Sequence, residues 1–455
     1  RGNLHTMTTT EQFPTTIVRR SDLDGPVLTP GAPGYDSTRS VWNGMIDHRP
    51  ALIVQCAAVN DVVTAIRTAR EHDLEIGVRC GGHNIAGLAV PHGGLMIDLT
   101  GLDGVTVDPV TLRARVQGGA MLGALDRATQ RFGLATTAGN VSHTGVGGLT
   151  LGGGMGWLAR QHGLTCDNVV SYTVVTANGE LVRASADEHP DLFWGLRGGG
   201  GNFGIVVEFE FRLHPVGTRT LVADLTFPLD RAAGPLRGWR DLAEQAPRPA
   251  TLTAEIAGDT VTLGYVWVGD PEAGRSLLPA LREIGVPDGE AVSELSYLTL
   301  QTRDDSIEGH SYRRYWKGHY LPELSDSAIA ALLDRDPADA TLPGVSLQAY
   351  GGAIADVDED ATAFSHRRAR FEYVAGVTWT DPDEDSLRMG AARHAAAKLD
   401  RFASGAYVNA LSDECAAGVR RAYSDAKRAR LTALKDTYDP GNVFHLNHNI
   451  APSTH

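Results

Sequence analysis

Residues 51–84 read ALIVQCAAVNDVVTAIRTAREHDLEIGVRCGGHN, a stretch with the pattern of a β-α-β unit. Apolar runs at residues 51–55 and 75–79 predict two buried strands. The apolar spacing between them predicts a helix over residues 61–71, with Asn60 as its N-cap. Such a unit indicates a fold that mixes helices with sheets.

A glycine pair and a histidine follow the second strand directly, as Gly81, Gly82 and His83. Glycine has no side chain, so main-chain N–H groups here can come close to a ligand. The imidazole beside them offers a nucleophilic nitrogen. For an isolated histidine, a hydrogen bond to the backbone is the more frequent role, but the strand end and the glycine pair favour an extended anionic ligand.

Two longer glycine clusters lie further along the chain. GVGGLTLGGGMG at residues 145–156 contains seven glycines in twelve residues, a composition that predicts neither a regular helix nor a regular strand. LRGGGGNFGIVVEFEFRLHPVG at residues 196–217 ends in alternating apolar residues that predict a strand through Leu213. We expect both clusters to surround one ligand.

The second half of the chain has a different pattern. TLTAEIAGDTVTLGYVWVG at residues 251–269 predicts part of an antiparallel sheet, and residues 270–285 predict a covering helix. Near the end, residues 407–411 predict a strand, and residues 416–438 predict a helix that ends before Pro440.

These patterns together predict an α+β fold in two domains. We expect a ligand-binding domain over residues 7–215 and a second domain over residues 216–404, with an antiparallel sheet covered by helices. Residues 405–455 would return to the first domain. The polar and apolar alternation of residues 441–452 suits a closing segment laid over the ligand.

The charge and composition of the chain favour a small-molecule partner. With 41 basic and 55 acidic side chains, the formal net charge is −14, so the protein as a whole repels nucleic acids and anionic membranes. Hydrophobic residues make up 42% and charged residues 21%, a composition typical of soluble globular enzymes. We expect a monomer or a homodimer.

The cysteines and the N-terminal residues predict a location. Cys56, Cys80, Cys166 and Cys415 are far apart and form no CxxC pair, so neither a zinc site nor a disulfide framework is expected. Residues 1–16 lack the apolar core of a signal peptide, and no apolar run approaches the roughly 18 residues of a membrane helix. These features fit a reducing cytoplasm.

A dinucleotide-binding fingerprint is one alternative for the glycine clusters. Gly154, Gly156 and Ala159 satisfy the pattern GxGxxA, and Glu180 follows at about the right distance. That fingerprint should follow a buried apolar strand, whereas the residues before Gly154 are rich in glycine. The context therefore argues against a Rossmann site.

Four motifs occur in order along the chain: VRCGGHNIAGLAV at 78–90, GNVSHTGVGGLTLGGGMGWLARQHGLTCDN at 139–168, DLFWGLRGGGGNFGIVVEFEF at 191–211 and YDPGNVFHLNHNIAP at 438–452. Together they resemble the berberine-bridge-enzyme-like flavoproteins of the vanillyl-alcohol-oxidase superfamily, of the type found in bacterial secondary metabolism. The resemblance covers nearly the whole chain. It implies a PCMH-type FAD-binding domain, a substrate domain and an FAD-linked oxidase activity.

The resemblance also implies how the cofactor is attached. In this family the histidine after the double glycine is bonded covalently to the dimethylbenzene methyl group of the flavin, and that position is His83. Many relatives carry a second bond from a cysteine, and alignment on TGVGG places that cysteine at Val141, so we expect a single link. Cys166 lies well past the matching position and is expected to be a small buried thiol, with Cys80 and Cys415 likewise structural.

The same resemblance implies a cradle for FAD. Its residues are Arg79, Gly81, Gly82, Asn84, Gly145, Gly147, Gly148, Gly153, Gly154, Gly204, Ile205 and Val206. Glycine amides offer donors to the pyrophosphate and leave room for the flat ring. Asn447 and Asn449 are expected on one face of a last strand, within reach of the polar edge of the ring, with ordinary turn or surface asparagines as the alternative.

Hydride transfer to a flavin is easiest when a base removes the adjacent hydroxyl or amine proton. The Y-x-N motif of the family matches Tyr407 and Asn409, which would share one strand face. A second family position, variably Glu, Gln or Tyr, falls at Tyr350, with Gln348 beside it. A tyrosine is a poor base unless a neighbour favours its phenolate, so packing roles for both rings remain the alternative. Ala410 replaces an aromatic residue of relatives and enlarges the pocket.

The resemblance places Thr144 at the position that controls access of dioxygen to the reduced flavin in relatives. Its small side chain leaves this route open and favours an oxidase. We expect two-electron oxidation of a small organic substrate, by alcohol, amine or C–H dehydrogenation, with dioxygen as acceptor and peroxide released. One alternative is a flavin-dependent oxygenase or oxidative cyclase of a polyketide-like product. Another is a non-catalytic, flavin-containing ligand-binding protein.

Overall fold

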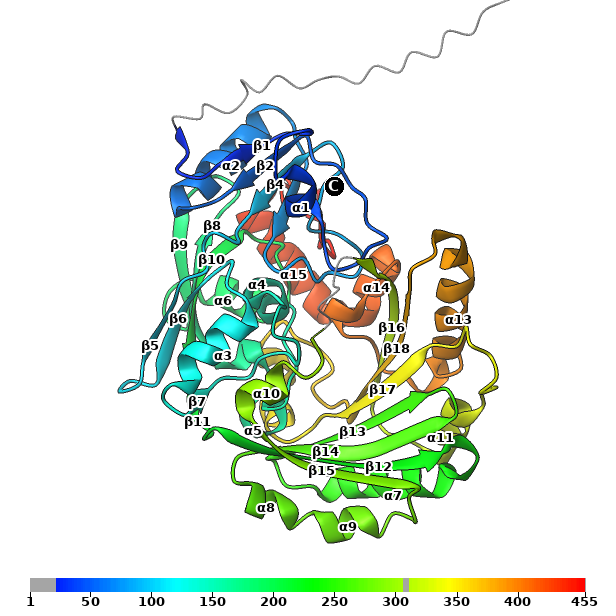
Figure 1. The fold of residues 1–455 in the computed structure, drawn as a ribbon. Helices are drawn as coiled ribbons and strands as arrows, with labels where there is room; N and C mark the ends of the chain where they lie inside the picture. The colour runs from blue at the N-terminus through cyan, green and yellow to red at the C-terminus, as the bar shows by residue number, and fades with distance from the viewer. Residues whose placement is uncertain (1–21, 306–310, 455) are drawn as a thin grey trace, which may run out of the picture.

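The computed structural model describes residues 22–305 and 311–454 of the 455-residue chain (Figure 1). Its strands form sheets of four, five, two and seven strands. The seven-stranded sheet lies in residues 219–379, and the other three lie in residues 27–215. Residues 1–16, for which no signal peptide is expected, lie outside the described residues. Among the described helices, none has the length and apolar character needed to cross a membrane.

The four-stranded sheet contains the β-α-β unit predicted from the sequence. Its order is β1 (Val27–Leu28), β2 (Leu52–Gln55), β4 (Leu95–Asp98) and β3 (Ile76–Arg79), with α1 (Tyr35–Arg39) and α2 (Val59–Glu71) as its helices. β2 and β3 both pair in parallel with β4, which lies between them. The predicted parallel unit is therefore confirmed, and the chain leaves β3 directly into Gly81, Gly82 and His83.

The start of α2 differs from the prediction. The helix begins at Val59 with Ala58 as its N-cap, so Asn60 is not the cap. The Asp61 carboxylate accepts hydrogen bonds from the N–H groups of Ala57 (2.8 Å) and Ala58 (3.1 Å). The Asp61 carboxylate thus binds the N–H groups of the backbone that enters the helix, whereas an N-cap at Asn60 would accept from N–H groups of the following turn.

The five-stranded sheet is antiparallel in its pairings. Its order is β5 (Val105–Asp108), β6 (Arg113–Gln117), β10 (Ile205–Arg212), β8 (Val169–Val175) and β9 (Leu181–Ser185). Around it lie α3 (Leu122–Gln130), α5 (Ala159–His162), α6 (Pro190–Leu196), the 3-10 helix η2 (Thr165–Asn168) and the pair β7 (Leu134–Ala135) and β11 (His214–Pro215). The strand predicted through Leu213 is present as β10.

The glycine-rich residues 145–156 contain a short helix, α4 (Val146–Leu151), which the composition did not predict. The Thr150 hydroxyl donates to the Val146 carbonyl oxygen (2.7 Å), and the Val146 and Leu151 side chains are buried. Their burial offsets the cost of about 1 kcal/mol that each helical glycine carries. The described residues before Gly154 thus form a helix and not a strand, which rules out the Rossmann alternative.

The seven-stranded antiparallel sheet has the order β15 (Gly289–Ser296), β12 (Arg219–Pro228), β14 (Thr260–Val268), β13 (Ala250–Ala257), β17 (Gly344–Ala349), β18 (Phe371–Trp379) and β16 (Arg313–Leu321). Its helices are α7 (Ala233–Gln245), α8 (Pro271–Arg275), α9 (Leu278–Arg282), α10 (Tyr297–Gln301), α11 (Asp326–Leu333), α12 (Ala353–Asp356) and α13 (Asp385–Ala397), with short 3-10 turns η3 (Leu229–Arg231), η5 (Glu359–Ala361), η6 (Pro382–Glu384) and η7 (Asp400–Phe402). Figure 1 shows α7, α8 and α9 on the face of the sheet turned away from the glycine-rich half. The predicted sheet with covering helices is confirmed, but the single helix predicted over residues 270–285 is two short helices, α8 and α9.

The C-terminal residues differ from the prediction in three places. One predicted helix is two, α14 (Cys415–Ala422) and α15 (Asp425–Tyr438), because the Ser424 hydroxyl accepts from the Lys427 N–H (3.3 Å) and starts a new helix. Residues 407–411 form the 3-10 helix η8 (Val408–Ala410) and not a strand. Successive buried residues there do not alternate as a strand surface would. Residues 441–452 contain no strand either.

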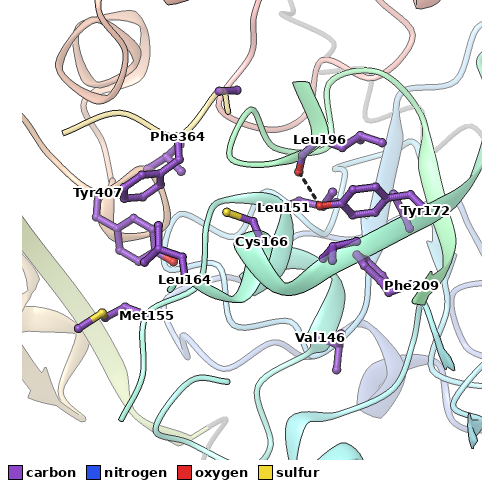
Figure 2. Packing of buried hydrophobic residues seen from close by; sticks show 14 of the residues in the cluster. Val146, Leu151, Met155, Leu164, Cys166, Tyr172, Leu196, Phe209, Phe364 and Tyr407 are labelled. Atoms are coloured by element: carbon purple, nitrogen blue, oxygen red, sulfur yellow. Dashed lines mark hydrogen bonds between the residues drawn. The ribbon is translucent and has the colours of Figure 1, made fainter. Parts of the chain in front are cut away.

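One core cluster joins the two halves of the molecule. Figure 2 shows Tyr407 and Phe364 on one side of Cys166, with Tyr172 and Phe209 on the other. The Tyr407 and Phe364 rings lie 6.4 Å apart at their centroids, and the Tyr172 and Phe209 rings lie 5.5 Å apart. Because this core is shared, the seven-stranded sheet cannot shift against the glycine-rich half without opening apolar contacts.

A buried ion pair anchors the last part of the chain. Lys435 Nζ lies 2.7 Å from Asp439 Oδ2, and both side chains are 0% exposed. The same ammonium donates to the carbonyl oxygens of Asn202 (2.8 Å) and Phe444 (3.0 Å). The Asp439 carboxylate in turn accepts from the N–H groups of Val443 (2.8 Å) and Phe444 (2.9 Å). This network fixes the segment after α15 against the second glycine cluster.

We predict that Lys435→Met destabilises the protein by about 3–5 kcal/mol, because the Asp439 carboxylate would stay buried without its cation. Thermal unfolding followed by circular dichroism should show a midpoint lowered by about 5 °C or more. The control is Arg428→Met, which removes an exposed pair with Asp425, whose side chain is 96% exposed. Equal midpoints for the two variants would contradict the anchoring role.

Candidate active site

A cavity of about 620 Å³ lies between the glycine-rich half and the seven-stranded sheet. The loop after β3, the start of α4 and residues 199–206 line it from one half. Strands β17 and β18 line it from the other, and residues 407–410 and 444–448 complete it. The cavity is therefore built from segments far apart in the sequence, with a volume typical of cofactor and substrate sites.

Two loops of the cavity wall approach one another at glycines. A Cβ added at Gly81 would clash with the backbone nitrogen of Gly145, and one added at Gly145 would clash with the Cys80 side chain. Gly148 and Gly201 differ, because a Cβ at either position would meet nothing within 4 Å. The first pair permits close packing of the loops, whereas the second pair leaves space in the cavity.

Several buried polar atoms of the wall have no hydrogen-bond partner among the described residues. They are Asn140 Oδ1, Gln348 Nε2, Asn447 Oδ1 and His448 Nε2. Burial also lowers the pKa of His448 to about 4, so this imidazole is neutral near pH 7. An unsatisfied buried polar atom costs about 1–3 kcal/mol, so this wall fits a large ligand that supplies both donors and acceptors.

His83 lies in the cavity wall with its ring held on several sides. The Trp42 ring stacks on it, with centroids 4.8 Å apart and planes 15° apart. His83 Nε2 lies 2.7 Å from His143 Nδ1, and Thr144 Oγ1 lies 3.4 Å from His83 Nδ1. His143 was not predicted as a site residue, although it stands within the glycine-rich motif between Val141 and Thr144, which both line the cavity.

Tyr407 and Asn409 meet in the wall through a turn and not through a strand face. The Tyr407 hydroxyl oxygen accepts from the Gly154 N–H (2.9 Å) and from the Asn409 side-chain amide (2.9 Å). Burial raises the pKa of Tyr407 well above its usual range, although both donors act against that shift. The hydroxyl is therefore protonated at neutral pH, and its own proton remains for a partner in the cavity.

Glu372 is a functional candidate that was not predicted from the sequence. It lies on β18, directly opposite Gln348 on β17, and both side chains line the cavity. The Tyr350 hydroxyl donates to Glu372 Oε2 (2.9 Å). Burial raises the pKa of the Glu372 carboxyl to about 7. A single acid on the cavity-facing side of an apolar strand was the available signal, but the sequence does not say which side faces the cavity.

The structure brings most of the predicted site residues to one cavity. Gly81, Gly82, His83, Asn84, Val141, Thr144, Gly145, Gly147, Gly148, Gly204, Ile205, Val206, Gln348, Tyr407, Asn409 and Asn447 line it. Arg79, Gly153, Gly154, Tyr350 and Asn449 do not. Arg79 instead pairs with the buried Asp98 (3.4 Å), and Tyr350, which is 1% exposed, reaches the cavity only through Glu372.

The expectations for the C-terminal asparagines and the cysteines need correction. Asn447 and Asn449 lie in irregular backbone, so the shared strand face is wrong. Cys166 is buried as expected, but Cys415 is exposed. Cys80 lines the cavity, and burial raises the pKa of its thiol to about 11, which keeps it protonated and weakly nucleophilic.

Comparison with known proteins adds to this geometry. The family described as FAD binding domain matches residues 50–185, and the family described as berberine and berberine like matches residues 406–451. An FAD-linked oxidoreductase of Dictyostelium discoideum is 30% identical over 437 residues, covering 94% of this chain and 95% of the relative. The (R)-6-hydroxynicotine oxidase of Paenarthrobacter nicotinovorans is 32% identical over 448 residues, covering 94% and 97%.

A solved structure matches the whole architecture. The crystal structure of 6-hydroxy-D-nicotine oxidase from Arthrobacter nicotinovorans superposes with a TM-score of 0.86 at 30% identity, covering 95% of this chain and 98% of that chain. The two matched families lie at the two ends of the described chain, and their residues line the same cavity. An FAD-binding site is therefore the use of this cavity that the comparisons support.

We predict that Gly148→Leu folds but binds FAD about 10-fold less tightly or worse, because leucine favours the helix α4 yet fills open cavity space. Visible flavin absorbance per protein would measure binding, and circular dichroism would measure folding. Gly390→Leu is the matched control, since a Cβ there also meets nothing within 4 Å, but on α13. Full flavin content in Gly148→Leu would place the cofactor elsewhere.

Proposed function

Because the chain belongs to the berberine-bridge-enzyme-like family of FAD-linked oxidoreductases, we propose that it oxidises a small organic substrate by two electrons in this cavity, with dioxygen as the final acceptor. FAD, when bound, supplies the two-electron acceptor. The observation that carries the proposal is the placement of Glu372 and the Tyr407 hydroxyl on the wall of a glycine-lined cavity. An acid and a hydroxyl there can manage the substrate proton.

We propose that cofactor binding and substrate binding belong to different sheets of the fold. Residues 7–215 hold the cofactor, with residues 1–21 outside the described part, and residues 216–404 supply the substrate side. Residues 405–455 return to the cofactor side, as the contacts of Lys435 with Asn202 and Phe444 support. The glycine backbone of the first half gives N–H donors to the phosphates, while Asn447 offers an amide to the flat ring.

His83 is the proposed point of covalent attachment. Its position in the cavity wall supports this role, as does the protonated state of the neighbouring Cys80 thiol. Val141, which aligns with the second attachment site of many relatives, lines the cavity with a side chain that cannot form a bond to flavin. A single link is therefore proposed.

Glu372 is the proposed base, with Tyr407 as the group that orients the substrate. A carboxyl with a pKa of about 7 is ionised in half of the molecules at neutral pH and is a stronger base than an ordinary glutamate. It can take the proton of a hydroxyl or amine as hydride leaves the adjacent carbon. Tyr350 is a positioning residue in this scheme, because its hydroxyl donates to Glu372, and Gln348 lies opposite on β17.

We predict that Glu372→Gln slows anaerobic flavin reduction by about 10²–10⁴-fold, measured by stopped-flow bleaching with a substrate. In the unaltered protein this rate should rise with pH and level off above about 7, because only the carboxylate accepts a proton. Tyr350→Phe should move this rise in rate to higher pH. The Tyr350 hydroxyl stabilises the Glu372 carboxylate, so its loss raises the pKa of that carboxyl.

The control for this series is Glu255→Gln, which changes an exposed acid on β13, a strand of the same sheet separated from β18 by β17. Its rate and pH profile should match those of the unaltered protein. A Glu372→Gln variant with an unchanged pH profile would remove this carboxyl from the mechanism.

We predict that the protein keeps its flavin after acid precipitation, because a carbon–nitrogen bond survives unfolding, whereas His83→Ala releases the flavin into the supernatant. Flavin absorbance of pellet and supernatant measures the two fractions, and the modified peptide should contain position 83. Complete release from the unaltered protein would exclude covalent attachment.

We predict that Thr144→Leu slows reoxidation of the reduced flavin by dioxygen and leaves anaerobic reduction unchanged, because Thr144 lines the cavity with a small side chain. Mixing the reduced protein with aerated buffer measures reoxidation, and a peroxide assay measures the product. Unchanged reoxidation would remove Thr144 from the route. Labelled oxygen found in the organic product, instead of peroxide, would favour the oxygenase alternative.

A further inference from the structure

We propose that His143 is a positioning residue for the covalent attachment of FAD, acting by holding the proton on Nε2 of His83. The inference rests on the covalent bond at His83 in the proposed function. It concerns a residue that has no role in the proposed oxidation itself. The contact between His83 Nε2 and His143 Nδ1, at 2.7 Å, carries the inference.

The contact joins two loops whose relative position is fixed by backbone packing. His83 follows β3, and His143 precedes α4. The two loops approach so closely at Gly81 and Gly145 that a Cβ on either would clash. The loop of His143 is also tied to α3, because Leu122 N–H donates to the Thr144 carbonyl oxygen (2.9 Å). The two imidazoles therefore meet as a consequence of the fold and not by side-chain flexibility.

The plane of the His83 ring is fixed as well. The Trp42 ring stacks on it at 4.8 Å, and the Arg314 guanidinium lies over the same indole, 4.1 Å from the ring centroid. Arg314 also donates to the Trp42 carbonyl oxygen, and Trp42 N–H donates to the Gly82 carbonyl oxygen (3.0 Å). Tilting His83 away from His143 would break this stack.

The hydrogen bond decides which nitrogen of His83 can react. A neutral imidazole carries one N–H and one lone pair. When Nε2–H donates to His143 Nδ1, the lone pair is on Nδ1 of His83, on the side of Thr144 Oγ1 at 3.4 Å. In this tautomer Nδ1 is the nitrogen that has the nucleophilic lone pair.

The same contact gives the proton a path as the new bond forms. Overall, a C–H bond of the flavin methyl group and the N–H bond of His83 break, and a C–N bond forms. Two electrons enter the ring system, and dioxygen takes them up with two protons as hydrogen peroxide. Without a proton acceptor, the alkylated His83 would carry a positive charge beside the ring, and His143 Nδ1 is the base in contact with that proton.

The test compares His143→Asn with His143→Leu, two side chains with the same number of heavy atoms and the same branching. The Asn carbonyl oxygen occupies about the place of Nδ1 and can accept the hydrogen bond, whereas Leu cannot. Each protein is prepared without flavin from riboflavin-starved cells and is then incubated with FAD in air, and acid-insoluble flavin is followed with time, per total bound flavin. We expect covalent attachment to be fastest in the unaltered protein, slower in His143→Asn, and slowest in His143→Leu, which should be about 10-fold or more slower than His143→Asn. His394→Ala, an exposed position on α13, should match the unaltered protein.

Equal rates for Asn and Leu, whether fast or slow, would overturn the inference, because the acceptor would then have no effect. If the unaltered protein itself released all of its flavin in acid, the covalent attachment would be wrong and this inference with it. The substrate-dependent bleaching of the flavin is measured separately, so the two failures can be told apart.

Discussion

The site depends on one steric constraint, the approach of two backbone loops at Gly81 and Gly145. Each of these glycines occupies space in which a Cβ would clash with the opposite loop. The approach sets the position of everything that follows it in the two loops, including His83, Thr144 and the first turn of α4. The close packing of these two loops therefore determines the shape of the binding surface. It requires glycine at both positions, because a side chain would hold the loops apart.

Three other parts of the chain complete the site that the two glycine loops begin. The seven-stranded sheet brings Glu372 and Gln348 across from the glycine loops, and the turn at η8 brings Tyr407 to the N–H of Gly154. The Lys435 and Asp439 pair holds the last lining residues in place. Each part contributes a different chemistry, and the shared core around Cys166 keeps their spacing constant (Figure 2).

The sequence predicted the elements whose signal is local. The apolar periods of β2, α2 and β3, the alternation in β10 and the glycine pair before His83 all identify themselves within a few residues. The role of Glu372 could not be predicted from the sequence, because it depends on the pairing of its strand with that of Gln348 and on burial of its carboxyl. The turn at Tyr407 escaped because consecutive buried residues resemble a strand until the surrounding core is known. His143 needed two loops to be brought together, which no window of sequence contains.

The placement of residues 444–448 in the cavity wall has a consequence for the order of biosynthesis. These residues are translated after all the other segments that line the cavity, and until they are in place one side of it is missing. A nascent chain on the ribosome therefore has an incomplete cavity wall until these residues are synthesised. A chain that ends before residue 444 lacks this side of the cavity, so the site for FAD can be completed only after synthesis has passed these residues.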